Sequence, residues 1–546
     1  MTAVGRTLWN RRIPMRDGAE IAADVILPEG DGPFPTVLNR TPYGRWPDRP
    51  LCRRLVERGY AYVAIDVRGR GDSDGTFHPH RSDAPDGHDC VEWAAAQTWC
   101  TGAIGMVGGS YEGLTQWWTA QTRPPHLRCI VPLCVGAAPV ARWSFDTGIP
   151  YQYMAWWLFL VQGRTYQQGG PSWEEGFGHL PLRTLDERLG TTGSGWAGYV
   201  DGAFDYLDAR GALTPEQFAA LDVPVLIGVG WWDDQTTMDA WEALQSARSA
   251  ADCRLLVGPW DHGGNLAPRP LLGGLDVSAG VIDTLDHIER FLALHLKGEG
   301  QGVGADGRCR LFRTGEDRWE DRDAWPDPAT PAESWHVADG GRLVRDAPTA
   351  EEEHDGWTFD PARPLRDMVD LDVFAWSDPP LDRRYLQRGE DTLVYATEPL
   401  GAPLRVSGRV RFDGWISSDR PDTDVFFELT DVHPDGRAIT LGSEIGGHGL
   451  RLRHREPGVD RPLAPGEAVR VEIGGPYLHH TFLPGHRMQV ALRSTAWPFF
   501  ARNLGGGGAW ADEVVPHVAH NRLHRGPSHP SRLLVPVESA SGGAGR

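Results

Sequence analysis

The sequence predicts an α/β fold in its first half and an all-β fold in its second half. In the first half, short apolar runs alternate with helical patterns, which is typical of a mostly parallel sheet covered by helices on both faces. After a glycine-rich linker at 298–307, helical patterns almost vanish, and short alternating segments with Pro and Gly turns dominate. A length of 546 residues also indicates more than one domain.

The first half opens with alternating apolar and polar residues around Arg16-Asp17-Gly18, which predicts a hairpin over 13–27. The apolar runs that follow are expected strands, at 34–38, 60–67, 104–107, 129–135, 223–229 and 254–257. Helical patterns separate several of them, at 51–58, 86–97 and 236–247. A last amphipathic helix is expected to pack one apolar face on the sheet, formed by Val281, Leu285, Ile288, Leu292 and Leu296.

Between residues 141 and 221 the pattern changes to aromatic-rich helical material without a strand run. Because this insertion falls between the sixth and seventh strands, we expect it to form a cap over the strand ends. In the second half, strands are expected at 405–416, 424–430, 468–473 and 487–492, a spacing that favours a sandwich or a jelly roll. The expected boundaries are an α/β domain in two parts, 1–141 and 222–300, a helical cap over 142–221, and a β jelly-roll domain over 301–546.

The stretch 102–118, GAIGMVGGSYEGLTQWW, combines a buried strand, a serine among glycines and the start of a helix. The small residues Gly108, Gly109 and Gly113 allow a sharp strand-to-helix turn that lifts the Ser110 hydroxyl above the sheet edge. This is the nucleophile elbow of an α/β-hydrolase fold, although the second glycine comes one place later than in Gly-x-Ser-x-Gly. Taken alone, the spacing favours a plain turn. Whether Ser110 is a nucleophile therefore depends on whether the sequence also offers partners for it.

An acid and then a histidine follow the serine, in the order that an α/β-hydrolase requires. Asp233 and Asp234 lie just beyond one apolar strand, and His262 lies beyond the next. Open α/β sheets form their sites at these carboxyl ends. We therefore predict that Ser110 is a nucleophile, that His262 is its general base, and that a carboxylate orients the imidazole. The spacing leaves open which of the two carboxylates points inward.

The chain resembles the serine hydrolases of the cocaine esterase and X-Pro dipeptidyl-peptidase group (CocE/NonD hydrolases) over nearly its whole length. The resemblance rests on RTPYGR (40–45), DVRGRGDSDG (66–75), the block 89–113, GWWDD, GPWDH, PDTDVFFELTDVHPDGRA (421–438) and STAWPFFARNLGGG (494–507). The elbow of this family is Gly-x-Ser-Tyr-x-Gly, which residues 108–113 match. The resemblance implies a C-terminal jelly roll and assigns the acid to Asp233, the first carboxylate after Trp-Trp.

The backbone N–H of Tyr111, directly after the serine, is the expected first donor to an oxyanion. In the resembled family a tyrosine hydroxyl from the loop after the third strand is a second donor, and Tyr43 matches it. The expected pocket residues are Trp143, Trp156, Trp157, Asp234 and Gln235. Asp234 and Glu112 could bind a substrate amine, as in the similar α-amino acid ester hydrolases. The favoured interpretation of Glu112 is that it lies in the first turn of a helix, where the helix dipole favours an acidic side chain.

The net charge of −20 argues against nucleic acid or an anionic membrane as a partner. Seven cysteines without Cys-x-x-Cys spacing, and an N-terminus without an apolar signal core, predict a cytoplasmic protein with reduced thiols. No cofactor and no metal are expected, because His78 and His80, like His479 and His480, lack further ligands at suitable spacing. A homodimer is left open.

The predicted reaction is hydrolysis of a small acyl ester, or less favourably an amide, through an acyl-Ser110 intermediate. The same residues would serve an acyltransferase, an α-amino acid ester hydrolase or a peptidase, although X-Pro dipeptidyl cleavage is disfavoured because the chain starts almost directly at the catalytic domain. An alternative of another class is a binding protein with an inactive hydrolase domain, whose jelly roll recognises carbohydrate. The presence of all the expected site residues argues against it.

Overall fold

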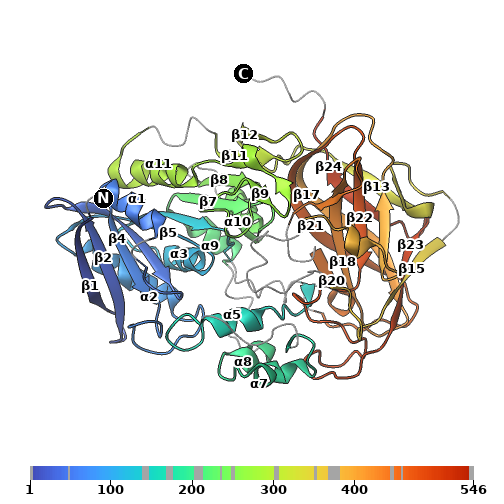
Figure 1. Ribbon diagram of the computed structural model, residues 1–546, viewed down its shortest axis with the longest axis horizontal. Helices are drawn as coiled ribbons and strands as arrows, with labels where there is room; N and C mark the ends of the chain where they lie inside the picture. The colour runs from blue at the N-terminus through green and yellow to red at the C-terminus, as the bar shows by residue number, and fades with distance from the viewer. Residues whose placement is uncertain are drawn as a thin grey trace.

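Strands of the first part of the chain form a ten-stranded sheet in the order β1-β2-β4-β3-β5-β6-β7-β8-β11-β12 (Figure 1). The computed structural model describes residues 4–46, 49–137, 147–167, 176–201, 213–233, 236–247, 253–300, 307–349, 353–366, 381–442, 448–456 and 459–539. The strands of this sheet are β1 (Val4–Pro14), β2 (Glu20–Pro28), β3 (Phe34–Thr41), β4 (Ala61–Asp66), β5 (Cys100–Gly109), β6 (Leu127–Leu133), β7 (Val225–Gly230), β8 (Cys253–Gly258), β11 (Cys309–Arg313) and β12 (Arg318–Arg322).

The centre of this sheet is parallel, from β4 through β3, β5, β6, β7 and β8 to β11. The opening hairpin of β1 and β2 is antiparallel, and β12 adds an antiparallel edge. The predicted hairpin and parallel sheet are therefore confirmed. One difference concerns β11 and β12, which lie beyond the predicted boundary at residue 300 and yet extend the first sheet.

Helices cover both faces of the sheet, because alternate residues of each buried strand point to opposite sides. Along β5, Met106 faces a cluster that contains side chains of α2 (Asp83–Ala95), α3 (Tyr111–Gln121) and α10 (Thr236–Ala247). The next residue, Val107, faces a cluster with α1 (Pro50–Glu57) and α11 (Thr284–Lys297). The apolar face of α11 was predicted to include Val281, but this residue precedes the helix and is 44% exposed.

The segment between β6 and β7 is helical in its described part, as the sequence predicts. It contains α5 (Met154–Leu160), η1 (Leu182–Thr184), α7 (Leu185–Leu189), α8 (Trp196–Val200) and α9 (Pro215–Ala220). Its aromatic residues pack together and against the C-terminal part of the chain: the rings of Tyr153 and Phe499 are 5.1 Å apart. Figure 1 shows α5, α7 and α8 beneath the space between the two sheets.

The C-terminal part forms a second, twelve-stranded sheet beside the first (Figure 1). Its strands are β13 (Ala332–Ala338), β14 (Arg342–Val344), β15 (Glu353–Phe359), β16 (Thr392–Ala396), β17 (Leu404–Ser418), β18 (Asp424–Val432), β19 (Ala438–Thr440), β20 (His448–Arg451), β21 (Val469–Phe482), β22 (Arg487–Arg493), β23 (Ala519–Arg525) and β24 (Arg532–Pro536). The long strands β17 and β21 pair antiparallel, and their inward residues form a separate apolar core.

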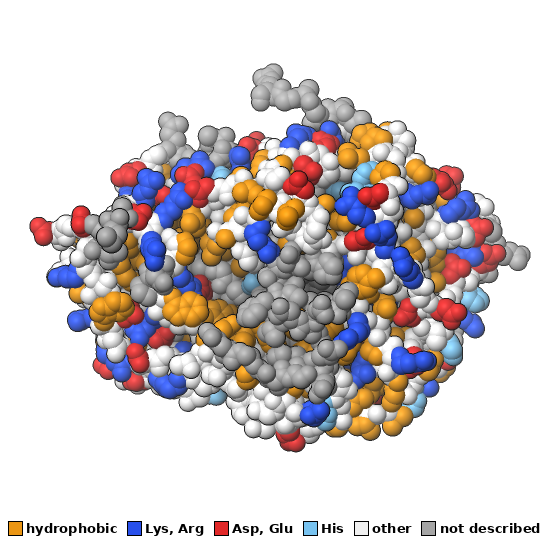
Figure 2. Space-filling model, in the orientation of Figure 1, with side chains coloured by type: hydrophobic (Ala, Val, Ile, Leu, Met, Phe, Trp, Pro, Cys, Tyr) orange, Lys and Arg blue, Asp and Glu red, His pale blue; other side chains and the backbone are white. Residues whose placement is uncertain are grey.

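The surface carries acidic and basic side chains interspersed on the face in Figure 2. Among the helices that the structure describes, none has both the length and the apolar character needed to cross a bilayer.

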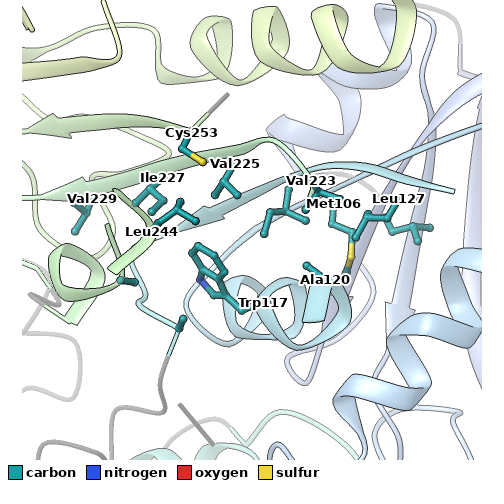
Figure 3. Close-up of a cluster of buried hydrophobic side chains, with 14 of the residues drawn as sticks. Met106, Trp117, Ala120, Leu127, Val223, Val225, Ile227, Val229, Leu244 and Cys253 are labelled. Carbon is teal, nitrogen blue, oxygen red and sulfur yellow. The ribbon is translucent and has the colours of Figure 1, made fainter. Parts of the chain in front are cut away.

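A single tryptophan fixes α3 on the sheet. Trp117 is fully buried and faces Val225 and Ile227 of β7, with Leu244 of α10 beside it (Figure 3). Since α3 begins directly after Ser110, this contact also fixes the direction in which the helix leaves the serine.

We expect Trp117→Ala to lower the free energy of unfolding by about 3–5 kcal/mol, because it removes a large buried side chain from a packed core. The control is Trp9→Ala, at a tryptophan that is 62% exposed on β1, where the change should stay within about 0.5 kcal/mol. Chemical denaturation measures both. Equal losses in the two variants would contradict this packing role.

Candidate active site

Ser110 occupies the turn between β5 and α3 with φ 58° and ψ −129°, a strained backbone for a residue with a side chain. The glycines around Ser110 are required because a larger side chain at their positions would clash with neighbouring atoms. A Cβ at Gly108 would lie 2.5 Å from the Cβ of Glu112, and a Cβ at Gly113 would lie 2.4 Å from Cγ1 of Val135. The late second glycine is thus explained by the contact of α3 with the chain after β6.

Asp233 and His262 form a hydrogen-bonded pair beyond the ends of β7 and β8. The Nδ1 atom of His262 lies 2.8 Å from Oδ1 of Asp233, whose residue is only 3% exposed. Asn265 Nδ2 donates to the other carboxylate oxygen, Oδ2, at 2.7 Å. Of the two carboxylates left open by the sequence, Asp233 is thus in contact with His262, whereas Asp234 and Gln235 lie outside the described residues.

Ser110 and His262 share their neighbours. The Cys134 thiol, just after β6, interacts with the backbone N–H of Ser110 and with the His262 side chain. The ligand-type atoms of Cys134, Asp233 and His262 all lie within 4.8 Å of one another. The Tyr43 hydroxyl hydrogen-bonds the side chain of Ser110 and is also close enough to His262 to feel its charge. The three residues predicted from distant parts of the sequence therefore meet at one edge of the sheet.

The electrostatics favour a protonatable imidazole. Burial of the His262 ring opposes its charged form, but Cys134 and the hydrogen-bonded Asp233 outweigh burial and hold the pKa of His262 well above its usual range. Burial raises the pKa of the Cys134 thiol itself. Asp233 is hydrogen-bonded to the ring, so its removal should lower the pKa of His262.

Tyr43 is placed to donate a hydrogen bond at the serine. Its hydroxyl oxygen accepts from Trp157 Nε1 at 3.2 Å and forms a second hydrogen bond with Ser110. Burial raises the pKa of Tyr43, so the hydroxyl keeps its proton. With the Trp157 donor occupying an oxygen lone pair, the hydroxyl proton is available to an acceptor at Ser110.

Tyr111 begins α3, so its backbone N–H belongs to the first turn, where N–H groups have no partner within the helix. Its side chain fixes this helix start: the hydroxyl donates to Asp83 Oδ2 at 2.5 Å and accepts from the backbone N–H of His80 at 2.9 Å. The Tyr111 ring stacks on Trp157, with centroids 5.7 Å apart.

The predicted pocket residues separate into two groups. Trp157 reaches the site through Tyr43 and Tyr111. Trp156 instead packs on Tyr153, at 5.0 Å, in the core of the helical segment and is 4% exposed. Trp143 lies outside the described residues.

Glu112 is occupied by two partners. Arg49 Nη1 donates to Oε1 at 2.6 Å, and Asn39 Nδ2 donates to Oε2 at 2.9 Å, in a residue that is 6% exposed. A buried carboxylate paired in this way holds the start of α3 against β3. No spacing along the chain indicates Arg49 or Asn39 as partners of Glu112.

Two residues at the site were not predicted as part of it. Asn265 follows His262 by three positions, and no spacing rule marks it. Cys134 was interpreted only as a reduced, buried thiol; its left-handed backbone, with φ 48°, turns it toward the histidine. Only the proximity of strand ends in space reveals either role.

An elbow serine on a parallel α/β sheet, with a paired acid and histidine at the neighbouring strand ends, defines the class of α/β hydrolases. The sequence matches the X-Pro dipeptidyl-peptidase (S15 family) over residues 17–264 and the X-Pro dipeptidyl-peptidase C-terminal non-catalytic domain over residues 301–534.

The relatives match nearly the whole chain. Cocaine esterase of Rhodococcus sp. (strain MB1 Bresler) is 31% identical over 97% of this chain and 98% of the relative. A putative serine esterase of Mycobacterium bovis is 27% identical over 96% of this chain and 94% of the relative. The solved structure of an α-amino acid ester hydrolase shares the fold, with a TM-score of 0.86 and 24% identity over 98% of both chains.

The chain belongs to the CocE/NonD hydrolases of the X-Pro dipeptidyl-peptidase family. It is a serine hydrolase, and two of these relatives are named as esterases.

The raised pKa of His262 predicts where activity is lost as the pH falls. A general base accepts the serine proton only when it is neutral, so with His262 in this predicted role kcat/KM should fall as the pH drops through a value above the ordinary histidine pKa of about 6.5. Asp233→Asn should move this acid limb to lower pH and reduce kcat by about 10⁴-fold, because the amide no longer fixes the tautomer. An unmoved limb, or the same effect from the exposed-site control Asp339→Asn, would contradict the pairing.

We expect Asn265 to act as a positioning residue for Asp233. Asn265→Ala removes a hydrogen bond to a carboxylate worth about 1.5–3 kcal/mol, so kcat should fall about tenfold to a hundredfold with little change in KM. The control is Asn521→Ala, a buried asparagine of β23 that bonds Ser494, which should lower stability and leave kcat unchanged. A fall in stability alone for Asn265→Ala would show that the residue is only structural.

Proposed function

We propose that Ser110, His262 and Asp233 are the catalytic triad of an esterase that hydrolyses small acyl esters through an acyl-Ser110 intermediate. The observation that carries the proposal is the hydrogen bond between His262 and Asp233 at the same edge as the strained serine. Tyr43 is hydrogen-bonded to the serine, and Cys134 interacts with both the serine backbone and the histidine. A hydroxyl, an imidazole and a carboxylate in this order can move a proton away from the serine as it attacks.

In the first half-reaction, Ser110 Oγ attacks the ester carbonyl while His262 accepts the hydroxyl proton. Asp233 stabilises the imidazolium, and the proton then passes from His262 to the departing alcohol. In the second half-reaction, a water molecule loses its proton to His262, attacks the acyl-serine and releases the acid. The proton returns to Ser110, so the enzyme is regenerated.

The oxyanion formed in each half-reaction would receive two hydrogen bonds, from the Tyr43 hydroxyl and from the backbone N–H of Tyr111. Tyr43 is supported by its existing bond to Ser110 and by the Trp157 donor that orients it. The stacked rings of Tyr111 and Trp157 would form one apolar wall of the pocket beside Ser110, which favours an acyl group with aromatic or other apolar character.

The helical segment after β6 would act as the cap of this pocket, and the second sheet would be a jelly roll. Arg70 supports the first inference, because its guanidinium donates to the carbonyls of Val161 and Gly163 and so ties the end of α5 to the loop after β4. The antiparallel pairing and the separate apolar core of the second sheet support the jelly roll. A cytoplasmic location and a homodimer stay predictions from the sequence.

Hydrolysis of α-amino acid esters with the same triad is the second candidate, in keeping with the shared fold. The pairing of Glu112 with Arg49 and Asn39 argues against this carboxylate as an amine ligand. An acyltransferase would use the same residues and differ only in the acceptor, so added alcohols or amines should be tested as acceptors in place of water.

The proposal is tested with a panel of p-nitrophenyl esters and aminoacyl amides on wild type and Ser110→Ala. We expect ester hydrolysis by the wild type, a fall of about 10⁴ to 10⁶ in kcat for Ser110→Ala, and loss of fluorophosphonate labelling, because the triad acts as a unit. Ser278→Ala, at an exposed serine, is the matched control and should keep both signals. Labelling that persists in Ser110→Ala would assign the nucleophile elsewhere, and no labelling of the wild type would favour a binding protein.

A further inference from the structure

Four side chains that can bind metals meet in the C-terminal part of the chain, away from the triad residues in sequence. Asp431 lies near the end of β18 and His433 follows that strand, whereas His480 lies on β21 and His486 in the turn before β22. No further ligand stands at a suitable spacing from His479 and His480 along the sequence. The antiparallel pairing of β18 with β22, in which Asp431 is opposite Met488, brings Asp431 and His486 together.

The three imidazoles surround one carboxylate. His486 Nδ1 lies 2.9 Å from both oxygens of Asp431. His480 Nε2 and His433 Nε2 lie 3.5 Å and 3.7 Å from Asp431 Oδ2. A tetrahedral zinc ion with bonds of about 2.0 to 2.2 Å keeps its donor atoms about 3.3 to 3.5 Å apart. The donor atoms of Asp431, His433 and His486 all lie within 4.8 Å of one another, and His480, which approaches only the Asp431 oxygen, would have to move toward the other two to complete a four-ligand shell.

His480 gives an independent indication of a missing partner. The residue is 3% exposed, and its Nε2 atom has no hydrogen-bond partner among the described residues, because 3.5 Å to Asp431 is too long for a well-formed bond. On the other side of the ring, Nδ1 lies 2.8 Å from Thr314 Oγ1. When Nδ1–H donates to this hydroxyl, the lone pair of Nε2 faces the carboxylate, the arrangement that a bound cation requires.

One ring of this cluster lies beside a basic side chain and can be reached from solvent. Arg437 approaches His433 Nδ1 at 3.5 Å, on the ring edge away from Asp431, and is held by Asp435. The His433 side chain is 22% exposed, which leaves a path for an ion from solvent.

We propose that Asp431, His433, His480 and His486 bind a divalent transition-metal ion, with Zn²⁺ as the best fit. Imidazole nitrogen suits zinc, copper and nickel, whereas calcium and magnesium prefer oxygen donors. Four protein ligands form a closed shell, which is typical of a structural site. Thr314, whose hydroxyl is hydrogen-bonded to His480 Nδ1, follows β11 of the first sheet and bridges to His480 of the second, so the ion would fasten the two sheets where they meet.

Zinc binding to the full-length protein tests the proposal. The protein is stripped with EDTA and titrated with Zn²⁺ against a chromophoric chelator, and thermal unfolding is followed with and without the ion. We expect one tight site per chain and a higher Tm with zinc. His433→Ala and His480→Gln should each weaken binding by about 100-fold or more and abolish the rise in Tm, since loss of a residue that only hydrogen-bonds a ligand already costs about 10- to 100-fold.

Two control variants make the outcome decisive. His354→Ala removes an exposed histidine of β15 and should bind zinc as the wild type does. His262→Ala removes the other group of ligand-type side chains, Cys134, Asp233 and His262, and should keep the tight site. Zinc retained in His433→Ala but lost in His262→Ala would overturn the proposal. A wild-type protein that binds no stoichiometric zinc would also overturn it. A cooperative thermal unfolding transition of each metal-free variant shows that the variant is folded.

Discussion

The structure depends on one strained turn, in which the chain passes from β5 to α3 through a left-handed backbone at Ser110. Such a conformation costs about 1–3 kcal/mol and persists only where the surroundings over-determine it. Here the helix on one side is held by Trp117 against β7, and the strand on the other is central in a parallel sheet. The glycines at 108 and 113 leave room for the two to meet.

The remaining site residues come from loops at the same edge, each fixed by a separate contact. Asn265 holds Asp233, Asp233 holds His262, and Trp157 of the helical segment holds Tyr43. The hydroxyl of Tyr43 is thus oriented by a residue more than a hundred positions away, whose own position depends on packing against the C-terminal part. Chemistry at the first sheet is therefore coupled physically to the fold of the second.

The sequence predicts what is local or ordered along the chain. Strongly apolar strands, the helices that separate them and the order of serine, acid and histidine could all be identified, because each leaves a periodic or positional signal. Pairing between distant strands leaves no such signal. It decides that β11 and β12 belong to the first sheet and that Asp431 meets His480 and His486. The contact of Arg49 with Glu112, between the starts of two helices, likewise leaves no signal along the chain. Asn265 and Cys134 fall in the same category, since their roles arise from proximity in space alone.

The hairpin of β11 and β12 means that the linker at 298–307 is not a place where the protein can be divided. These strands lie after the linker and cover the outer edge of β8, a strand whose apolar residues are buried on both faces. A fragment that stopped at the linker would leave that edge with unpaired backbone groups, a template for aggregation. The first sheet thus takes its last two strands from beyond the linker, and two regions that look modular in the sequence share one sheet.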